Sequence, residues 1–284
     1  MYGAYCTSSP MIIDKSIKAR FYASYRHQNF SLPDSIMHYM AMNPKNAKNP
    51  ILVISYLCYD KNGWAVSNNG NLKSINLNNI SSKLWITRYV DLNPVSAEDK
   101  SVTLIIPKIH QCDARWLNIT NLNVSFNELM VFNSNVECSR LIHVNVKYEN
   151  GRNMAFEKFF ELFPKIERLY YIPPSNDSAI TFNTFTELLK NPQFLKLQRC
   201  SLLDTPEDFD IEAFYKYMKK NKDTGFCLSF WDTVSEAYRN RLQDIVSEIL
   251  ESETHEFKPP FFGFSGQDVA MCDKLWNLCR ENLF

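Results

Sequence analysis

The side chains that could support catalysis are scattered along this sequence. Its five histidines stand at positions 27, 38, 110, 143 and 255, and none belongs to an HExxH zinc motif or pairs by spacing with a cysteine. No GxSxG nucleophile motif occurs, and the seven glycines form no phosphate-binding loop. An acidic cluster at Glu248, Glu251, Glu253 and Glu256 favours a solvated helix face over a metal site or a catalytic carboxylate pair. We therefore expect a protein that has no enzymatic activity and uses no metal or cofactor.

The amino-acid composition limits the kinds of partner that the protein is expected to bind. The chain has 284 residues, of which 45% are hydrophobic, so it can bury a sizeable core in one large domain or two small ones. Its 31 basic and 31 acidic side chains cancel, which argues against general binding to nucleic acid or to a membrane surface. The basic run at Lys216, Lys219, Lys220 and Lys222 favours a solvated face over contact with an acidic partner. The N-terminal residues do not resemble a secretion signal, and no apolar run is long enough for a spanning helix.

The eight cysteines contain no CxxC pair, and three of them, Cys138, Cys200 and Cys227, fall at predicted strands where a small apolar residue is suitable. We interpret them as reduced, structural thiols rather than as a metal site or a disulfide framework. Together with the missing secretion signal, this predicts a cytoplasmic or nuclear protein.

A unit of about 28 residues recurs through the middle of the chain. Its spacing template, apolar-x-x-apolar-x-x-apolar-x-apolar, has third-position anchors at Leu117, Val144, Leu169, Cys200 and Leu228. A period in the twenties, with one short strand and one helix per unit, is typical of a leucine-rich-repeat solenoid, in which stacked units share one core. We therefore expect an α/β fold whose strands at 116–120, 142–148, 168–172, 199–203 and 226–231 lie side by side in one parallel sheet, with helices on the other face.

The helices between these strands follow from apolar periodicity. We expect them at 102–109, 126–132, 154–163, 182–189 and 211–218, followed by a long helix at 234–250 and a last one from about residue 267. Residues 51–57 fit either a helix or a strand, residues 60–82 fit a loop, 84–90 a strand and 254–265 a break. The predicted division is an N-terminal tail (1–30), a short segment (31–59), the solenoid (60–253) and a C-terminal extension with a helix (254–284).

Binding residues are expected on the exposed face of the sheet. Side chains alternate along a strand, so the residues between inward anchors point outward. These residues are Asn118, Asn145, Tyr170, Ser201 and Ser229, and their outward neighbours are Trp116, His143, Arg168, Arg199 and Trp231. Aromatic side chains and arginines are favoured at recognition surfaces, although a solvated sheet face that tolerates aromatics explains the pattern as well.

The segment NFSLPDSIMHYMAMN, from Asn29 to Asn43, resembles the first helix of a divergent F-box in the large nematode-type F-box families. The chain from Ile51 to Ser252 resembles the leucine-rich-repeat-like region that follows the F-box there, through segments such as NPILVISYL, KLWITRYV and SEAYRNRLQDIVSEILE. The resemblance covers about three-quarters of the chain. It implies a substrate-recognition subunit of a cullin-type ubiquitin ligase, in which the F-box binds a Skp-type adaptor and the repeats hold an unknown protein substrate.

The sequence departs from that family at one place. An F-box continues with further helices and commonly a Cys-basic-x-aromatic element, but here NPKNAK runs directly into NPILVI, so the expected element is missing between Lys48 and Asn49. The adaptor contacts that the resemblance implies are then reduced to Leu32, Pro33, Ile36, Met37 and Met40. We accordingly expect binding of the adaptor to be weak or absent. The alternative function is a stand-alone repeat scaffold for protein interactions, with no link to a ligase.

Overall fold

The computed structural model describes residues 51–68, 70–132, 135–174 and 179–283, and all of them belong to one compact unit. The predictions that fall on residues 1–50 lie outside the described residues. They concern the N-terminal tail and the five adaptor-contact residues Leu32, Pro33, Ile36, Met37 and Met40.

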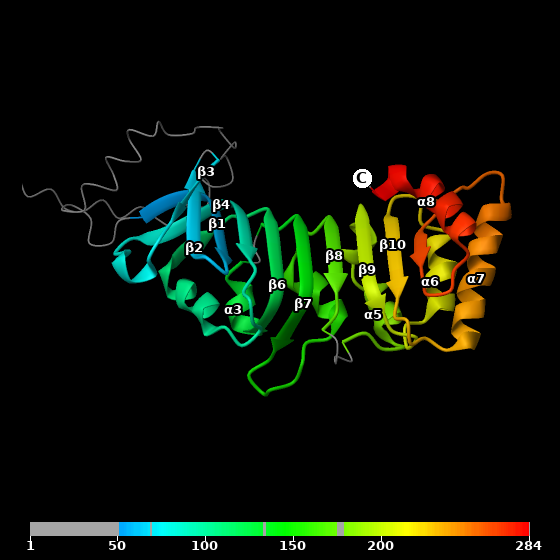
Figure 1. Ribbon diagram of the computed structural model, residues 1–284, viewed down its shortest axis with the longest axis horizontal. Helices are drawn as coiled ribbons and strands as arrows, with labels where there is room; N and C mark the ends of the chain where they lie inside the picture. The colour runs from blue at the N-terminus through cyan, green and yellow to red at the C-terminus, as the bar shows by residue number, and fades with distance from the viewer. Residues whose placement is uncertain (1–50, 69, 133–134, 175–178, 284) are drawn as a thin grey trace, which may run out of the picture. The chain divides into compact units, whose positions relative to one another are not determined.

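Eleven strands form one open sheet in the described part of the chain (Figure 1). Its order is β11-β10-β9-β8-β7-β6-β4-β1-β2-β3, and β5 pairs with the beginning of β4. The strands are β1 (Ile51–Asp60), β2 (Gly63–Asn68), β3 (Asn71–Ser74), β4 (Lys83–Leu92), β5 (Ile109–Cys112), β6 (Trp116–Ser125), β7 (Cys138–Lys147), β8 (Arg168–Ile172), β9 (Arg199–Thr205), β10 (Gly225–Phe230) and β11 (Phe261–Gly263).

The sheet is parallel from β11 to β1, and only the pairs β1–β2 and β2–β3 are antiparallel. Each of the five strands predicted from the repeat spacing is present, and they occupy consecutive places β6-β7-β8-β9-β10. The prediction that these strands lie side by side in one parallel sheet is confirmed. The protein is therefore an α/β protein built on a mostly parallel, open sheet.

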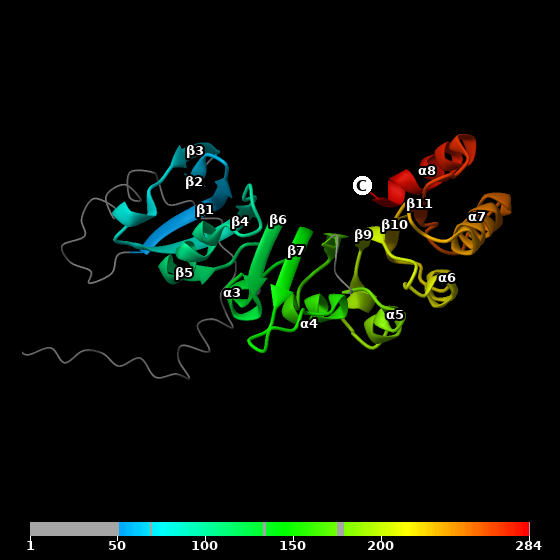
Figure 2. The ribbon, with the colours of Figure 1, turned by 60° about the horizontal axis from the view of Figure 1, so that its bottom comes forward.

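Short helices connect the strands, and α3 to α6 lie along one face of the sheet, whereas α7 and α8 are longer and follow at its C-terminal end (Figure 2). The α-helices are α3 (Phe126–Met130), α4 (Phe159–Leu162), α5 (Thr184–Leu188), α6 (Ile211–Met218), α7 (Glu236–Glu251) and α8 (Val269–Leu283), and the 3-10 helices are η2 (Leu77–Asn79), η3 (Lys100–Lys108), η4 (Phe156–Lys158) and η5 (Phe194–Lys196). Polar N-cap side chains satisfy backbone amides in the first turn of several of these helices. Ser125 and Glu128 form a reciprocal capping box at α3, and Asp210 accepts a hydrogen bond from the Ala213 amide at α6.

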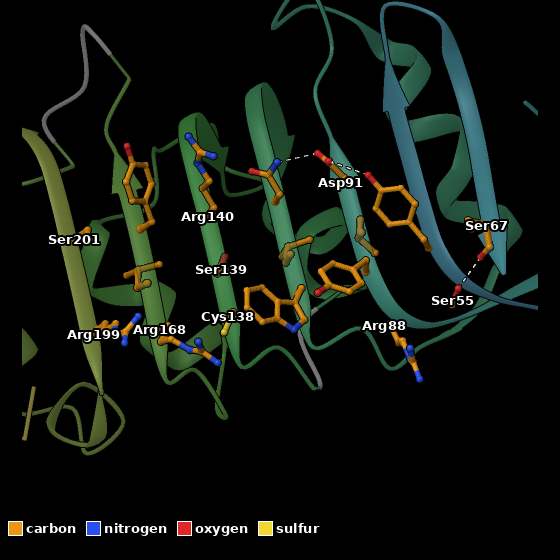
Figure 3. Close-up of a pocket in the computed structure, with 18 of the residues that line it drawn as sticks. Ser55, Ser67, Arg88, Asp91, Cys138, Ser139, Arg140, Arg168, Arg199 and Ser201 are labelled. Atoms are coloured by element: carbon orange, nitrogen blue, oxygen red, sulfur yellow. Dashed lines mark hydrogen bonds between the residues drawn. The ribbon is translucent and has the colours of Figure 1, made fainter. Parts of the chain in front are cut away.

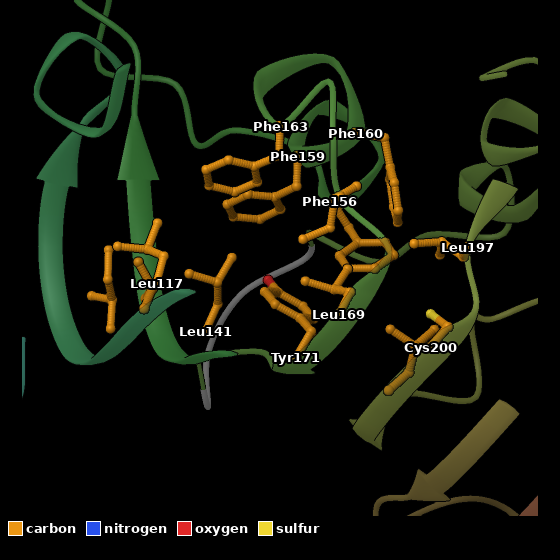
Figure 4. Packing of buried hydrophobic residues seen from close by; sticks show 14 of the residues in the cluster. Leu117, Leu141, Phe156, Phe159, Phe160, Phe163, Leu169, Tyr171, Leu197 and Cys200 are labelled. Atoms are coloured by element: carbon orange, nitrogen blue, oxygen red, sulfur yellow. The ribbon is translucent and has the colours of Figure 1, made fainter. Parts of the chain in front are cut away.

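The core lies between the sheet and these helices, and it is rich in phenylalanine (Figure 4). The five predicted anchors, Leu117, Val144, Leu169, Cys200 and Leu228, are all buried. Around Tyr171 of β8 the rings of Phe156 and Phe159 pack with centroids 4.6 and 5.5 Å away. Burying each such side chain contributes about 1.5–3 kcal/mol, so this aromatic layer holds the helices to the sheet.

Three local predictions are corrected by the structure. Residues 60–82, expected as a loop, contain the strands β2 and β3, because Gly63 and Gly70 take positive φ angles of 91° and allow tight turns between β1 and β2 and between β2 and β3. The segment expected as a helix at 102–109 is the 3-10 helix η3, which contains Pro107 and passes into β5. The expected break at 254–265 contains the short strand β11. Residues 51–57, left open between helix and strand, belong to β1.

The repeat register is also corrected, at β7. Leu117 of β6 pairs with Ser139, and Val144 pairs with Leu122 further along the strands. The physical cause is a left-handed residue in each strand, Asn121 in β6 and His143 in β7, with φ angles of 52° and 51°. This conformation interrupts the alternation of side chains, so each strand has two inward pairs, and in β7 only the second, Val144 and Val146, is apolar at both positions and fits the spacing template. The predicted alignment of Val144 with Leu117 is therefore wrong.

Candidate functional site

A groove of about 970 Å³ lies on the face of the sheet that α3 to α6 leave uncovered (Figures 2 and 3). Side chains from β1, β2, β4, β6, β7, β8 and β9 line it, together with Gly70 and Leu72 of the β2–β3 hairpin. Leu72 is 56% exposed. At the other end of the same face, Trp276 of α8 packs edge-on against Phe261 of β11, with ring centroids 5.3 Å apart. The hairpin and α8 therefore bound the open face at its two ends.

Strand register builds the groove from two rows of side chains that run across the sheet. The first row contains the register partners Tyr56, Tyr89, Trp116, Cys138, Arg168 and Arg199. The ring of Tyr89 meets Tyr56 edge-on at 6.0 Å and stacks on Trp116 at 5.6 Å. Tyr89 and Trp116 are each 41% exposed, although large aromatic side chains usually have most of their surface buried. The first row is therefore aromatic on one half and cationic on the other.

The second row contains the register partners Cys58, Asp91, Asn118, Arg140, Tyr170 and Ser201. Asp91, the second residue of this row, is held in place because the Tyr56 hydroxyl donates to its Oδ2 at 3.0 Å and the Asn118 amide donates to its Oδ1 at 2.8 Å. Burial raises the pKa of the Tyr56 hydroxyl, and the Asp91 charge raises it further. These hydrogen bonds fix the aromatic half of the groove in one arrangement.

The arginines of the groove are positioned by aromatic rings. The guanidinium of Arg168 lies 5.1 Å from the ring centroid of Trp116, and that of Arg140 lies 4.9 Å from the centroid of Tyr170. The Nε atom of Arg168 is buried and has no hydrogen-bond partner among the residues that the structure describes. Among the described residues, neither of these arginines nor Arg199 forms an ion pair with a carboxylate. Three guanidinium groups thus face the groove with donors that the described residues leave available.

Among the residues that the structure describes, the groove brings together no set of groups suited to catalysis. Burial raises the pKa of the Cys138 thiol, while the neighbouring Arg168 charge opposes the increase, so the thiol is not an activated nucleophile. No histidine lines the groove, and Asp91 is its single carboxyl group within the described residues. In the same part of the chain, no cluster of three or more histidine, cysteine, aspartate or glutamate residues could hold a metal ion. The arrangement offers stacking surfaces and hydrogen-bond donors.

Six of the ten predicted concave-face residues line the groove, namely Trp116, Asn118, Arg168, Tyr170, Arg199 and Ser201. The other four do not line it. His143 is exposed in the left-handed conformation, and Asn145 pairs with Asn123 beyond the groove. Ser229 accepts a hydrogen bond from the Asp204 amide at 3.1 Å, and Trp231 follows β10 and packs partly against the core.

Several lining residues were not predicted, above all Tyr56, Tyr89, Asp91 and Arg140. Arg140 was missed because the register of β7 was placed too far along the strand. Tyr89 could have been found, since it belongs to the predicted strand at 84–90 and is followed by the apolar Val90. Tyr56 required knowledge that residues 51–57 form a strand beside β4.

Comparison with known proteins returned no relative: no protein-family model matches the sequence, and no curated protein or solved structure is significantly similar to it. None of the helices in the described ranges has the length and apolar character that crossing a bilayer requires.

Proposed function

We propose that this protein is a non-enzymatic protein-binding module that holds a partner protein in the groove on the open face of its sheet. One observation carries the proposal, the row of contacting rings Tyr56–Tyr89–Trp116 that continues into Arg168. Aromatic side chains and arginine dominate binding energy at protein interfaces, and Tyr89 and Trp116 are each 41% exposed while they pack against each other. A rigid aromatic surface loses little conformational entropy when a partner covers it.

The fold that supports this function is proposed to be a leucine-rich-repeat-like solenoid. Five consecutive parallel strands in sequence order, each preceded or followed by a short helix on the same face, support the proposal. In such an arrangement each repeat contacts its neighbours, and the sheet provides an extended binding surface.

The narrower proposal is a substrate-recognition subunit of a cullin-type ubiquitin ligase, located in the cytoplasm or nucleus. Its support is the resemblance of residues 29–43 to an F-box helix, which lies outside the described residues. Residues 51–57 belong to the sheet, so they do not supply a second F-box helix. Specific interfaces bury about 1,200–2,000 Å² from roughly 20–30 residues a side, which the five candidate contacts Leu32, Pro33, Ile36, Met37 and Met40 cannot provide alone.

Calorimetric titration with a Skp-type adaptor tests this narrower proposal. We expect weak or no binding to the present chain, and a gain of affinity when the missing F-box helix is inserted after Lys48. Tight binding that is abolished by Leu32→Ala together with Pro33→Ala would show that the remnant suffices. No binding even after the insertion would favour the alternative, a stand-alone repeat scaffold.

The groove itself is tested by affinity capture of the tagged intact protein from cells, in parallel with a Tyr89→Ala/Trp116→Ala variant. A partner retained by the wild type and lost by the variant supports the proposal. Phe182→Ala, which removes an exposed ring outside the groove, is the matched control and should retain the partner. An identical set of proteins on all three baits would show that the groove is not the binding surface.

A further inference from the structure

The charge on the groove differs from that of the chain as a whole. The full sequence has no net charge, yet the described lining contains four arginines, Arg88, Arg140, Arg168 and Arg199, against the single carboxyl group of Asp91. Asp91 accepts hydrogen bonds from Tyr56 and Asn118 rather than from an arginine. Among the described residues, none of the three arginines on β7 to β9 forms an ion pair with a carboxylate, although Glu137 and Glu167 stand next to Cys138 and Arg168 in the chain.

Arg168 and Arg199 are the strongest candidates for contact with an anion. They are register partners on neighbouring strands, and Figure 3 shows them next to each other in the groove. Like charges on adjacent strands destabilise a sheet unless a counter-charge lies between them. Arg168 is further constrained by the Trp116 ring, and its buried Nε has no acceptor. A guanidinium fixed in this way can donate two parallel hydrogen bonds to a carboxylate or a phosphoryl group.

The aromatic half of the groove, formed by Tyr56, Tyr89 and Trp116, determines which second kind of side chain the ligand must carry. Strands lie about 4.8 Å apart, so the backbones of Trp116 on β6 and Arg199 on β9 are separated by about 14 Å across the sheet, whereas the Arg168 guanidinium reaches to 5.1 Å from the Trp116 ring centroid. An extended peptide advances about 3.3 Å per residue and covers the separation between the backbones in about four residues. A peptide that crosses the strands can thus place an aromatic or large apolar side chain on Tyr89 and Trp116 and an anionic side chain between Arg168 and Arg199.

We propose, on the basis of the protein-binding function above, that the groove selects an extended peptide segment that carries an anionic side chain within about four residues of an aromatic or large apolar side chain. The anionic group binds to Arg168 and Arg199, and Arg140 extends the cationic surface along the second row. Arginine and aromatic rings also suit single-stranded nucleic acid, but such binding needs a basic track along the whole backbone. Here Asp91 lies within the aromatic half, and the arginines other than Arg88 lie on β7 to β9.

The test uses the full chain as bait for random peptides displayed on phage, each of about 16 residues so that it can cross the strands at about 3.3 Å per residue. We expect enriched sequences in which aspartate or glutamate stands within about four positions of an aromatic residue. The best peptide, synthesised with a fluorophore, should lose about ten- to a hundredfold in affinity on Arg168→Gln or Arg199→Gln. Exchange of its acid for the corresponding amide should cause the same loss. A phosphoserine at the acidic position distinguishes a carboxylate from a phosphoryl preference.

The control is Arg152→Gln, which removes the same charge at an exposed turn outside the groove. It should leave affinity unchanged, and circular dichroism should show all variants folded. Enriched peptides that lack acids but depend on Trp116 would overturn the anionic preference and leave the protein-binding function intact. The absence of any enriched peptide would overturn the peptide proposal, whereas the capture experiment tests the wider function independently. Tighter binding of a thymidine oligonucleotide, lost on Arg168→Gln, would assign the groove to nucleic acid instead.

Discussion

Arg168 and Trp116 are in contact although a whole strand separates them. The guanidinium carbon lies 5.1 Å from the indole centroid, while β7 runs between β8 and β6. The register places Cys138 between the two residues. Because a cysteine side chain is short, the arginine can extend above it to reach the ring. The small residue on β7 is thus what connects the aromatic and cationic halves of the groove.

A double-mutant cycle should detect this contact. We expect Trp116→Ala and Arg168→Ala to show a coupling free energy of about 0.5–1 kcal/mol in urea unfolding, which is the usual strength of a cation–π contact at a half-exposed site. The pair Phe182→Ala and Arg168→Ala, in which the ring lies outside the groove, should be additive. Equal coupling in both pairs would mean that the Trp116 contact contributes nothing specific.

The sequence predicts the sheet better than it predicts the site. Buried anchors such as Leu169 and Cys200 recur at repeat spacing, and the parallel order of their strands follows from that period alone. The register of β7 does not follow, because an apolar template cannot show that His143 takes a left-handed conformation. Because the predicted register of β7 is shifted, the predicted site contains Asn145 where the groove contains Arg140. Glycines at turns also marked the hairpin β2–β3, but neither the short apolar run of β2 nor the polar, four-residue β3 shows an alternation of apolar and polar side chains.

Val144 and His143 are neighbours in β7, and Val144 is buried whereas His143 is exposed, so the same substitution can be compared at the two positions. Val144→Asp should unfold the protein or lower its free energy of unfolding by several kcal/mol, because Val144 is 2% exposed and an unpaired buried charge is costly against a total of about 5–15 kcal/mol. His143→Asp should change stability little, since His143 is exposed and aspartate tolerates a positive φ. Thermal unfolding followed by circular dichroism distinguishes them. Equal losses in Tm would refute the inward and outward assignment.

Asp99 should make stability depend on pH in the acid range. Its Oδ2 accepts a hydrogen bond from the Tyr59 hydroxyl at 2.7 Å and its Oδ1 accepts one from the Ser101 amide at 2.8 Å. The bond from Tyr59, followed by the bonds from Ser101, holds the pKa of Asp99 below its ordinary value of 3.8. The charged form is thus favoured in the folded state, so its stabilisation is complete above the unfolded-state pKa and is lost as pH falls through the folded-state pKa.

We expect Asp99→Ala to lower the free energy of unfolding by about 1–2 kcal/mol at neutral pH, the usual effect of losing a helix cap and a charged acceptor. The difference between wild type and Asp99→Asn should shrink as urea unfolding is repeated at pH values below the ordinary pKa. Asp208→Asn, at an exposed position, is the control. A difference for Asp99→Asn that grows on acidification would contradict the hydrogen-bonding assignment.

Cysteine alkylation should follow burial. Burial raises the pKa of the Cys200 thiol to about 12, and the residue is 0% exposed, so both its thiolate fraction and its access to reagent are low. Cys272 on α8 is half-buried. Iodoacetamide at mildly alkaline pH, followed by peptide mass spectrometry, should therefore modify Cys272 first and Cys200 only after urea is added. Modification of both thiols at one rate in the native protein would show that the region around β9 opens easily.

The two ends of the sheet affect how copies of this chain can associate. An open sheet has unpaired backbone N–H and C=O groups at its outermost strands, and long flat edges recruit further strands into aggregates and fibrils. Among the described residues these edges are β3, which is four residues long and carries Lys73, and β11, which is three residues long and follows Pro259 and Pro260. Short strands, a charged side chain and prolines all oppose the addition of another strand. Growth of the sheet from one molecule into the next is therefore blocked at both ends.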